Sequence, residues 1–292
     1  MRDRLYRVEA IVLKRSDYGE ADRLLTLFTP DLGKLRAIAK GARKPSSRKS
    51  GHVELFTHSA LLIARGRHLD VVTQADTLDA FLPLRENLDR LGFAYYLAEL
   101  VDQFVEEGDA LSRGEYHTRS ESSAPRDDGT VENQPLFDLL FHALKWLGDA
   151  ATDPALLARF FELHLLQHVG YRPQLFQCVN CGTPLEPVQN FFSAEAGGAL
   201  DPKCIETQRE HIAGHGRDVM PISLEALKVL RHLQTREWEA MRSLRLNAET
   251  HSEVEALMQR YIAQYLERNL KSVEFLRTLK QPVGVVAAER QS

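Results

Sequence analysis

The sequence predicts an α+β protein in which a small barrel of five short strands precedes a bundle of helices that carries one inserted element. Two observations along the 292 residues support this prediction, namely a change in the spacing of apolar residues and the position of the cysteines. Short apolar runs between turn signals fill the first 80 residues, whereas apolar residues recur at helical spacing after Pro83. All three cysteines lie between Cys178 and Cys204, which indicates one local cluster rather than a disulfide scaffold.

Five segments of the first part have the length and the aliphatic, aromatic or β-branched content of strands. They are residues 6–13, 24–29, 35–40, 55–64 and 70–75, and turn residues separate them. So many short strands in so few residues are typical of a closed barrel, and the five-stranded oligonucleotide-binding barrel (OB fold) is the obvious candidate. We therefore expect an OB-fold, DNA-binding domain at residues 1–80 and an α-helical domain at residues 81–292.

A stretch of this first domain, residues 33–51, is basic and contains no acidic residue. Its first half alternates as a strand does, so Arg36 and Lys40 share a face while Leu35 packs inward, and a Ser-rich loop follows Gly41. The net charge is +5 over the first 80 residues and −9 over the rest. A basic first domain followed by an acidic remainder indicates a protein that binds the phosphate backbone of nucleic acid, and an ordinary solvated surface is the alternative. The predicted phosphate-binding residues are Lys34, Arg36, Lys40, Arg43, Lys44, Arg48 and Lys49.

Helical spacing predicts one helix over residues 84–105, one that begins at Pro135 and one that Asp153 caps. On the first helix, Tyr95 and Tyr96 either stack on bases or belong to the core, and core is the common role at this spacing. A cap at residue 223 and a capping box over residues 250–253 predict two more helices, the second reaching residue 276. Polar residues 108–134 are expected to form a flexible insertion, and residues 281–292 a loose tail.

Two short hooks of candidate metal ligands interrupt the helical part. Cys178 and Cys181 form the first hook, and Asp201 and Cys204 form the second after 19 intervening residues. This separation is the spacing of a zinc ribbon, so residues 175–218 are expected to form a zinc-ribbon-like insertion that holds one structural Zn²⁺. Because an aspartate replaces the usual cysteine, the fourth ligand is the open point of this prediction.

Alternatives to this metal site stay open at the level of sequence. His211 or His215 can replace Asp201 as the fourth ligand, and the hooks can also be a ribbon without metal or a redox pair of cysteines. A catalytic zinc is disfavoured because no Glu or His is placed as an obvious general base. His164 and His168 are four residues apart on a helix but lack the metalloprotease pattern, so they are expected to be structural.

Composition and missing motifs narrow the classes of function. No apolar run is long enough to span a bilayer and the first residues do not open a signal peptide, so we expect a cytoplasmic, nucleoid-associated protein without a membrane partner. No P-loop, dinucleotide fingerprint, nucleophile motif or two-metal carboxylate cluster accompanies the basic stretch, which favours a binding protein over an enzyme. Two alternatives are a zinc-containing nucleic-acid enzyme and a sequence-specific regulator, although no helix-turn-helix motif supports the latter.

The chain resembles the RecO family of bacterial DNA-repair and recombination mediators over nearly its whole length. The order and spacing of short motifs carry the resemblance. In the first domain these are residues 18–24 (YGEADRL), 33–35 (GKL) and 40–43 (KGAR). In the second they are residues 160–166 (FFELHLL), 170–173 (GYRP), 178–181 (CVNC), 270–272 (LKS) and 275–276 (FL).

The resemblance implies an N-terminal OB barrel, a helical bundle and a zinc-ribbon-like insertion. It also implies binding of single- and double-stranded DNA, annealing of complementary strands and partnership with RecR. The role of the family is to displace single-strand binding protein so that RecA can load. The implied partners therefore include the C-terminal tail of single-strand binding protein and proteins of the RecA and RecF pathway.

Overall fold

The structure is a computed structural model that describes residues 5–107, 133–208, 219–266 and 270–280. The expected insertion at 108–134, apart from its last two residues, and the expected tail at 281–292 lie outside the described residues, as do His211 and His215. The chain divides into two compact units, Met1–Asp149 and Ala150–Ser292. The division falls beyond the first three helices, and the expected domain boundary at residue 80 stays a prediction.

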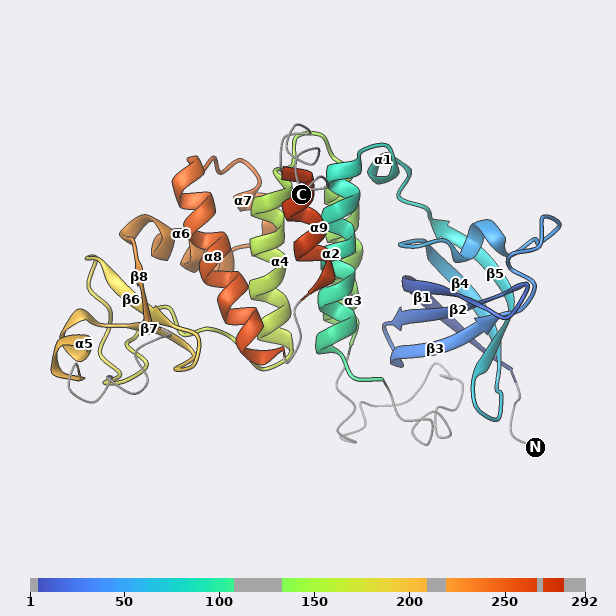
Figure 1. Ribbon diagram of the computed structural model, residues 1–292, viewed down its shortest axis with the longest axis horizontal. Helices are drawn as coiled ribbons and strands as arrows, with labels where there is room; N and C mark the ends of the chain where they lie inside the picture. Colours follow the sequence, from blue (N-terminus) through green and yellow to red (C-terminus); the bar gives the residue numbers. More distant parts are fainter. Residues whose placement is uncertain (1–4, 108–132, 209–218, 267–269, 281–292) are drawn as a thin grey trace, which may run out of the picture. The chain divides into compact units, whose positions relative to one another are not determined.

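The first unit contains a closed barrel, as expected for the predicted fold class (Figure 1). The order of the strands around the barrel is β1-β2-β3-β5-β4, and only β3 and β5 pair in parallel. The short 3-10 helix η1 precedes β4. The bounds are β1 Leu5–Tyr18, β2 Asp22–Thr29, β3 Gly33–Ala39, η1 Ser50–Val53, β4 His58–Ala64 and β5 Asp70–Asp79. The α+β class with a five-stranded barrel is therefore confirmed.

The barrel has an apolar interior and one apolar row on its outer face. Leu35 and Ala37 of β3 are fully buried inside, where they pack with alternate residues of the other strands. On the outside, Ile11 pairs with Phe28 on one neighbouring strand and with His58 on the other. This outer row is covered by helices, which leaves the remaining outer face of β1, β2 and β3 for other contacts.

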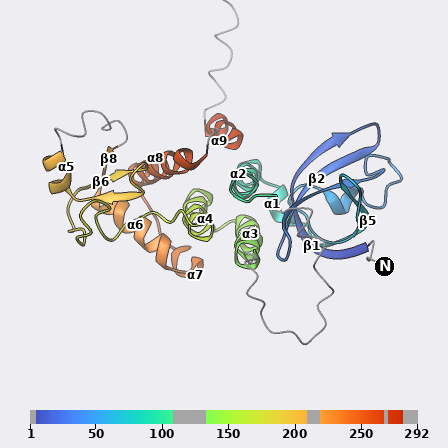
Figure 2. The same cartoon turned by 90° about the horizontal axis from the view of Figure 1, so that it is seen from below.

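Three helices complete the first unit, namely α1 Leu82–Arg85, α2 Leu88–Phe104 and α3 Gln134–Leu147. The helices α2 and α3 lie side by side in both views (Figure 2). Phe137 of α3 covers the outer row, and the centroid of its ring lies 6.0 Å from that of Phe28 and 5.6 Å from that of His58. The single helix expected over residues 84–105 is wrong, because α1 ends at Arg85 and α2 begins after its cap at Asn87. Of the two tyrosines, Tyr96 belongs to the core, where α2 packs against β1 and α3, whereas Tyr95 is 40% exposed.

The second unit is built on α4 Pro154–His168, against which α6 Leu224–Thr235 and α8 Ala248–Tyr265 pack. The predicted cap of α4 is confirmed, since Asp153 Oδ1 accepts from the N–H groups of Ala155 and Leu156 at 2.9 and 3.1 Å. The predicted cap of α6 is also confirmed, since Ser223 Oγ accepts from Ala226 N at 3.1 Å. The short helix α7 Trp238–Met241 and the helix α9 Lys271–Lys280 complete the described helices of this unit.

The predicted capping box at residues 250–253 is wrong. The helix α8 begins at Ala248, and Asn247 caps it by accepting from Thr250 N at 2.7 Å. Glu253 instead accepts from the N–H and the hydroxyl of Ser223 at 2.6 and 2.7 Å, so a contact between two helices replaces the local one. The same helix ends at Tyr265, and α9 is a separate helix rather than its continuation to residue 276.

A small three-stranded sheet in the second unit carries the cysteine hooks. Its strands are β6 Asn190–Ser193, β7 Gly198–Leu200 and β8 Val219–Ile222, in the order β7-β6-β8 and all antiparallel. The hairpin between β6 and β7 turns through Gly197 and Gly198. A Cβ atom on Gly198 would lie 2.2 Å from the carbonyl oxygen of Gln174, so only glycine permits this close approach. The helix α5 Pro202–Gln208 follows β7 directly.

Candidate nucleic-acid interface and thiol cluster

The basic strand β3 presents its cations outward, as its alternation predicted. Arg36 is exposed between the buried residues Leu35 and Ala37, and Lys40 is exposed just past the end of the strand. Lys44 and Arg48 are exposed on the loop that follows. Among the residues that the structure describes, these four cations have no ion pair. They form a set that we call the free cations: Arg36, Lys40, Lys44 and Arg48.

The other three predicted cations are fastened to the protein. Lys34 Nζ lies 3.3 Å from Asp102 Oδ1 of α2, and Lys49 Nζ donates to the carbonyl oxygen of Val72 at 3.0 Å. Burial lowers the pKa of Lys49, and the nearby charge of Asp22, which acts to raise this pKa, has the smaller effect. Lys34, Arg43 and Lys49 therefore shape the surface that carries the free cations, in addition to any contact they make with a ligand.

Hydrogen bonds anchor the basic loop to the turn between β1 and β2. Asp22 Oδ1 accepts from Gly41 N at 2.8 Å, where the glycine has a positive φ of 67°. Arg43 N donates to Ala21 O at 2.9 Å, and Arg43 Nη2 lies 3.3 Å from Asp17 Oδ2. These contacts bring together two of the sequence motifs, residues 18–24 and residues 40–43.

The register between the strands adds Lys14 and Tyr18 to this face, and sequence reasoning missed both. Alternation from Val8 through Val12 assigns Lys14 to the barrel interior, but an irregularity after Val12 shifts the register by one residue. Lys14 then pairs with Thr26, which pairs with Arg36, so the three side chains share the outer face. Tyr18 is 46% exposed at the end of β1. An exposed aromatic ring beside cations is the composition of a single-strand binding face.

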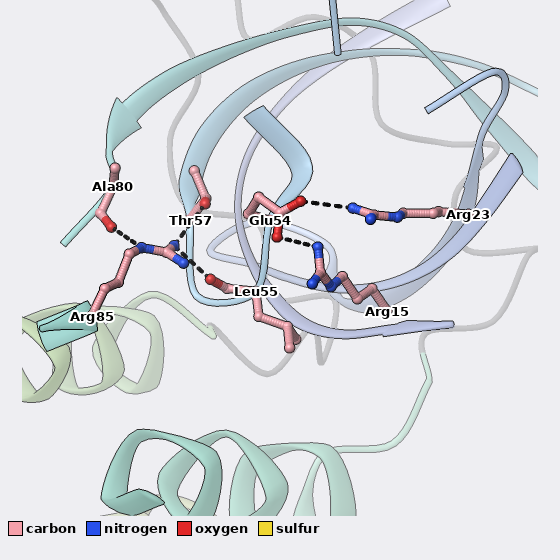
Figure 3. Close-up of polar contacts among 7 residues, drawn as sticks. All are labelled: Arg15, Arg23, Glu54, Leu55, Thr57, Ala80 and Arg85. Atoms are coloured by element: carbon pink, nitrogen blue, oxygen red, sulfur yellow. Dashed lines mark hydrogen bonds and ion pairs between the residues drawn. The ribbon is translucent and has the colours of Figure 1, made fainter. Parts of the chain in front are cut away.

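Two arginines lie over one end of the barrel interior, because the shift in register turns Arg15 inward and Arg23 continues the inward alternation of Leu25 and Leu27. Figure 3 shows Arg15 and Arg23 pointing at the two carboxylate oxygens of Glu54, and Arg23 Nη1 lies 2.8 Å from Glu54 Oε1. Burial alone would raise the pKa of Glu54, but the hydrogen bonds and charges of the two arginines hold this pKa below its ordinary value. Arg85 nearby donates to the carbonyl oxygens of Ala80 and Leu55, each at 2.7 Å. This network closes the barrel end and takes these arginines away from the free cations.

In the second unit, the structure gathers the three cysteine thiols into one cluster. The sulfur atoms of Cys178, Cys181 and Cys204 all lie within 4.8 Å of one another, and those of Cys178 and Cys204 are 3.7 Å apart. A tetrahedral site with Zn–S bonds of about 2.3 Å places its sulfurs about 3.8 Å apart, so this donor set fits a metal ion such as zinc. The hooks are thus close enough to hold a metal.

The carboxylate of Asp201 is not part of this group of ligand atoms. It caps α5 instead, since Asp201 Oδ1 accepts from Lys203 N at 2.7 Å. The backbone N–H of Asp201 points the other way and donates to Cys178 Sγ at 3.3 Å. The prediction that Asp201 supplies the fourth ligand stays a prediction.

The three thiols differ in exposure and in acidity. Cys181 is exposed, and hydrogen bonding to Thr183 lowers the pKa of its thiol to about 7. A hydrogen bond from Asn180 favours the thiolate of Cys204, but burial and the neighbouring thiols raise the pKa of Cys204 to about 11. A thiolate at Cys181 therefore forms at neutral pH, which is the form that binds metals.

The two histidines of α4 have structural surroundings, as expected. His164 Nε2 donates to the carbonyl oxygen of Leu233 at 3.0 Å, and its ring lies against Phe160. Burial lowers the pKa of both His164 and His168. Neither residue belongs to a cluster of metal-ligand atoms in the described part of the chain.

A groove of about 510 Å³ lies between α6, α7 and the start of α8. Cationic and apolar side chains line it together, and Glu225 lies among them. The lining residues include Lys228, Val229, Met241 and Arg245. This combination suits a ligand that has both acidic and apolar groups.

Comparison with known proteins agrees with this architecture. The family model described as "Recombination protein O N terminal" matches residues 1–81, and that described as "Recombination protein O C terminal" matches residues 129–274. The chain is 45% identical over 282 residues to the DNA repair protein RecO of Roseiflexus sp. (strain RS-1), covering 96% of this chain and 88% of the relative. It is 37% identical over 290 residues to the DNA repair protein RecO of Pelotomaculum thermopropionicum, covering 98% and 99%.

Among the described helices, none is sufficiently long and apolar to cross a bilayer. The barrel at the N-terminus, the helices after it and the thiol cluster agree with the two family matches and with the full-length similarity. The chain therefore belongs to the RecO family of DNA repair proteins.

Proposed function

We propose that this protein is a recombination mediator that binds single- and double-stranded DNA and anneals complementary strands. The observation that carries the proposal is the set of free cations on β3 and its loop. Exposed Lys and Arg without acidic partners release counterions when they bind phosphates, and this supplies affinity without sequence preference. Screening of two phosphate backbones by the same surface lets complementary strands approach, so annealing needs no covalent chemistry.

A charge-matched pair of variants tests this proposal. The first variant replaces the free cations by Ala, and the control replaces four exposed cations elsewhere: Lys145, Arg236, Arg242 and Arg260. Loss of four phosphate contacts should weaken binding to a single strand by about 200-fold near 0.15 M salt and slow annealing in proportion. The control should stay within about twofold, because nonspecific affinity follows local contacts rather than net charge. Equal effects of the two variants would place the DNA site elsewhere.

We further propose that the protein acts by binding alone, in the cytoplasm at the nucleoid. Incubation of labelled DNA with the protein and Mg²⁺ tests for turnover, which a zinc-containing nucleic-acid enzyme would show and a mediator would not. Binding to duplexes of unrelated sequence tests the other alternative. Comparable affinity for all of them supports a mediator, whereas a preferred site would support a sequence-specific regulator.

The three thiols are proposed to hold one structural Zn²⁺, which would crosslink the two hooks of the small sheet. Support comes from the 3.7 Å separation of Cys178 Sγ and Cys204 Sγ and from the exposed, acidic thiol of Cys181. Protein purified without added metal should contain about one zinc per chain and should lose thermal stability with a chelator. Zinc content near zero, with no response to chelator, would contradict this proposal.

The mixed groove at α6 and α7 is proposed to bind the C-terminal tail of single-strand binding protein, which is acidic and ends in an apolar residue in this family. Lys228 and Arg245 would pair with the acidic groups, while Val229 and Met241 would contact the terminal apolar side chain. The double variant Lys228→Glu and Arg245→Glu should lose binding of a labelled tail peptide. The matched control, Arg236→Glu and Arg242→Glu, should retain it, and loss in both variants would contradict the assignment.

Cooperation with RecR in loading RecA, together with contacts to the RecF pathway, is proposed from family membership. The measurement is RecA filament assembly on DNA coated with single-strand binding protein, with and without RecR. The free-cation variant should reduce assembly because it cannot hold the strand. Assembly that needs neither RecR nor the free cations would contradict this role.

A further inference from the structure

The thiol cluster contains three protein ligands in place of the four that a closed structural zinc site has. Cys178, Cys181 and Cys204 lie within 4.8 Å of one another, and no other Cys, His, Asp or Glu of the described residues belongs to the group. Asp201, at the position of the missing cysteine, is the nearest candidate in the sequence. What Asp201 does in the fold therefore bears on what completes the site, and the other candidates, His211 and His215, lie outside the described residues.

Asp201 divides its polar atoms between the helix and the cluster. Its side chain accepts from Lys203 N at 2.7 Å, and its carbonyl oxygen accepts from Cys204 N at 3.1 Å, so the residue starts α5. Only its backbone N–H, which donates to Cys178 Sγ at 3.3 Å, serves the thiols. Turning the carboxylate toward the sulfurs would leave an N–H group of the first helical turn without its cap.

Open space adjoins the three thiols. A cavity of about 410 Å³ is lined by Cys181 and Cys204 together with Thr183, Pro184, Glu186, Asp201 and Lys203. Cys181 is exposed, so the cavity reaches the cluster from solvent. Lys203 lies at this cavity with an 82% exposed side chain, and its ammonium is 4.0 Å from Glu186 Oε1. A small ligand can therefore reach the sulfurs from solvent, past one cation and two carboxylates.

We propose that a metal ion held by Cys178, Cys181 and Cys204 keeps its fourth position for a ligand from outside the chain, and that a small thiolate is the class of ligand that fits. The inference rests on the proposed metal site. Three thiolates select a soft or borderline metal, which prefers a further sulfur donor, and Lys203 offsets part of the negative charge of Glu186 and Asp201 at the cavity. The protein would thus carry an open metal site where a four-cysteine ribbon carries a closed one.

Cobalt absorption tests this proposal in the full-length protein. Co²⁺ alone is titrated into the wild-type chain, Asp201→Asn and Asp201→Cys under oxygen-free conditions with a phosphine reductant, and 2-mercaptoethanol is then added. Asn caps a helix as Asp does, so Asp201→Asn should bind Co²⁺ with the wild-type spectrum and affinity. In both chains 2-mercaptoethanol should raise the thiolate-to-cobalt absorption by about one third, because a fourth sulfur joins three.

Asp201→Cys supplies the fourth sulfur from the chain itself. It should bind Co²⁺ about tenfold more tightly and should not respond to 2-mercaptoethanol. Altered bands or weaker affinity in Asp201→Asn, with a wild-type spectrum that ignores 2-mercaptoethanol, would show that Asp201 closes the site and would overturn the inference alone. A wild-type spectrum that ignores 2-mercaptoethanol while Asp201→Asn behaves as wild type would show that another residue of the chain, such as His211 or His215, closes the site, and would overturn the inference as well. Absence of Co²⁺ binding in the wild-type chain would overturn the proposed metal site as well.

Discussion

The basic face of the barrel and the thiol cluster of the small sheet each gather side chains of one chemical kind, but they hold them differently. The free cations stand in solvent along β3 and its loop, so each is expected to contact a ligand independently of the others. The three thiols lie within 4.8 Å of one another and share hydrogen bonds. The comparison indicates that the barrel face acts as a sum of small contacts, whereas the thiol cluster acts as one unit.

Substitution of a single thiol should have the largest effect, which is on zinc affinity. A small effect would contradict the view that the thiol cluster acts as one unit. Cys178→Ser, Cys181→Ser and Cys204→Ser should each weaken zinc binding by about 1,000-fold or more, since each removes one of three protein ligands. Competition with a chelating dye measures this affinity. Thr183→Val is the control, because it removes a hydrogen bond of Cys181 but no ligand. A graded response, in which one cysteine matters little, would contradict a shared site.

Cations that are fastened in the barrel should affect stability rather than DNA binding. Glu54→Gln removes the charge that Arg15 and Arg23 share, which should cost about 1–3 kcal/mol of unfolding free energy by leaving two half-buried arginines poorly paired. Denaturant unfolding measures the cost, with the exposed Glu20→Gln as the control. An unchanged free energy of unfolding would show that the network in Figure 3 does not stabilise the barrel.

Single free cations should each have a small and similar effect on DNA binding. Arg36→Ala, Lys44→Ala and Arg48→Ala should each weaken single-strand binding by about fourfold near 0.15 M salt, and pairs should multiply. Lys34→Ala should instead lower stability, because Lys34 pairs with Asp102. Fluorescence anisotropy measures the affinities. If one substitution alone abolished binding, DNA binding would depend on a single residue rather than on the sum of many contacts.

Sequence pattern was sufficient where a local rule decides the outcome. The alternation of β3 predicted that Arg36 points outward, and the Asp-Pro pair at residue 153 predicted the cap of α4. The spacing of the hooks predicted that Cys178 and Cys204 meet. Each of these outcomes depends on backbone geometry within a few residues or on a motif of fixed spacing.

Pattern failed where distant groups compete for the same atoms. Glu253 matches a capping box, yet it binds Ser223 from another helix. Lys14 reads as an interior residue until the shift in register after Val12 turns it outward. These outcomes follow from packing between elements, which a single sequence does not display.

The two units should lose stability at different pH values on acidification, and this is the smallest of the expected effects. Burial lowers the pKa of His164 despite its hydrogen bond to Leu233 and the charge of Glu237, so the second unit should be fully stable above about pH 6.5 and should lose stability below it. Glu54 has a lowered pKa, so the barrel should lose stability only as the pH falls below about 4.3.

Tryptophan fluorescence in the variant Trp146→Phe follows this loss in the second unit, because the buried Trp238 then reports alone. Addition of His164→Gln should flatten the dependence of stability on pH between pH 5 and 7, apart from the part that His168 contributes. An unchanged dependence on pH would show that His164 is not linked to folding.

The salt dependence of single-strand binding tests the central claim most directly. The slope of log K against log salt should be shallower by about 2.8 in the variant that replaces Arg36, Lys40, Lys44 and Arg48, because each lost phosphate contact removes about 0.7. The control variant at Lys145, Arg236, Arg242 and Arg260 should keep the wild-type slope. If the free-cation variant also kept that slope, the basic face of the barrel would not be the DNA-binding surface.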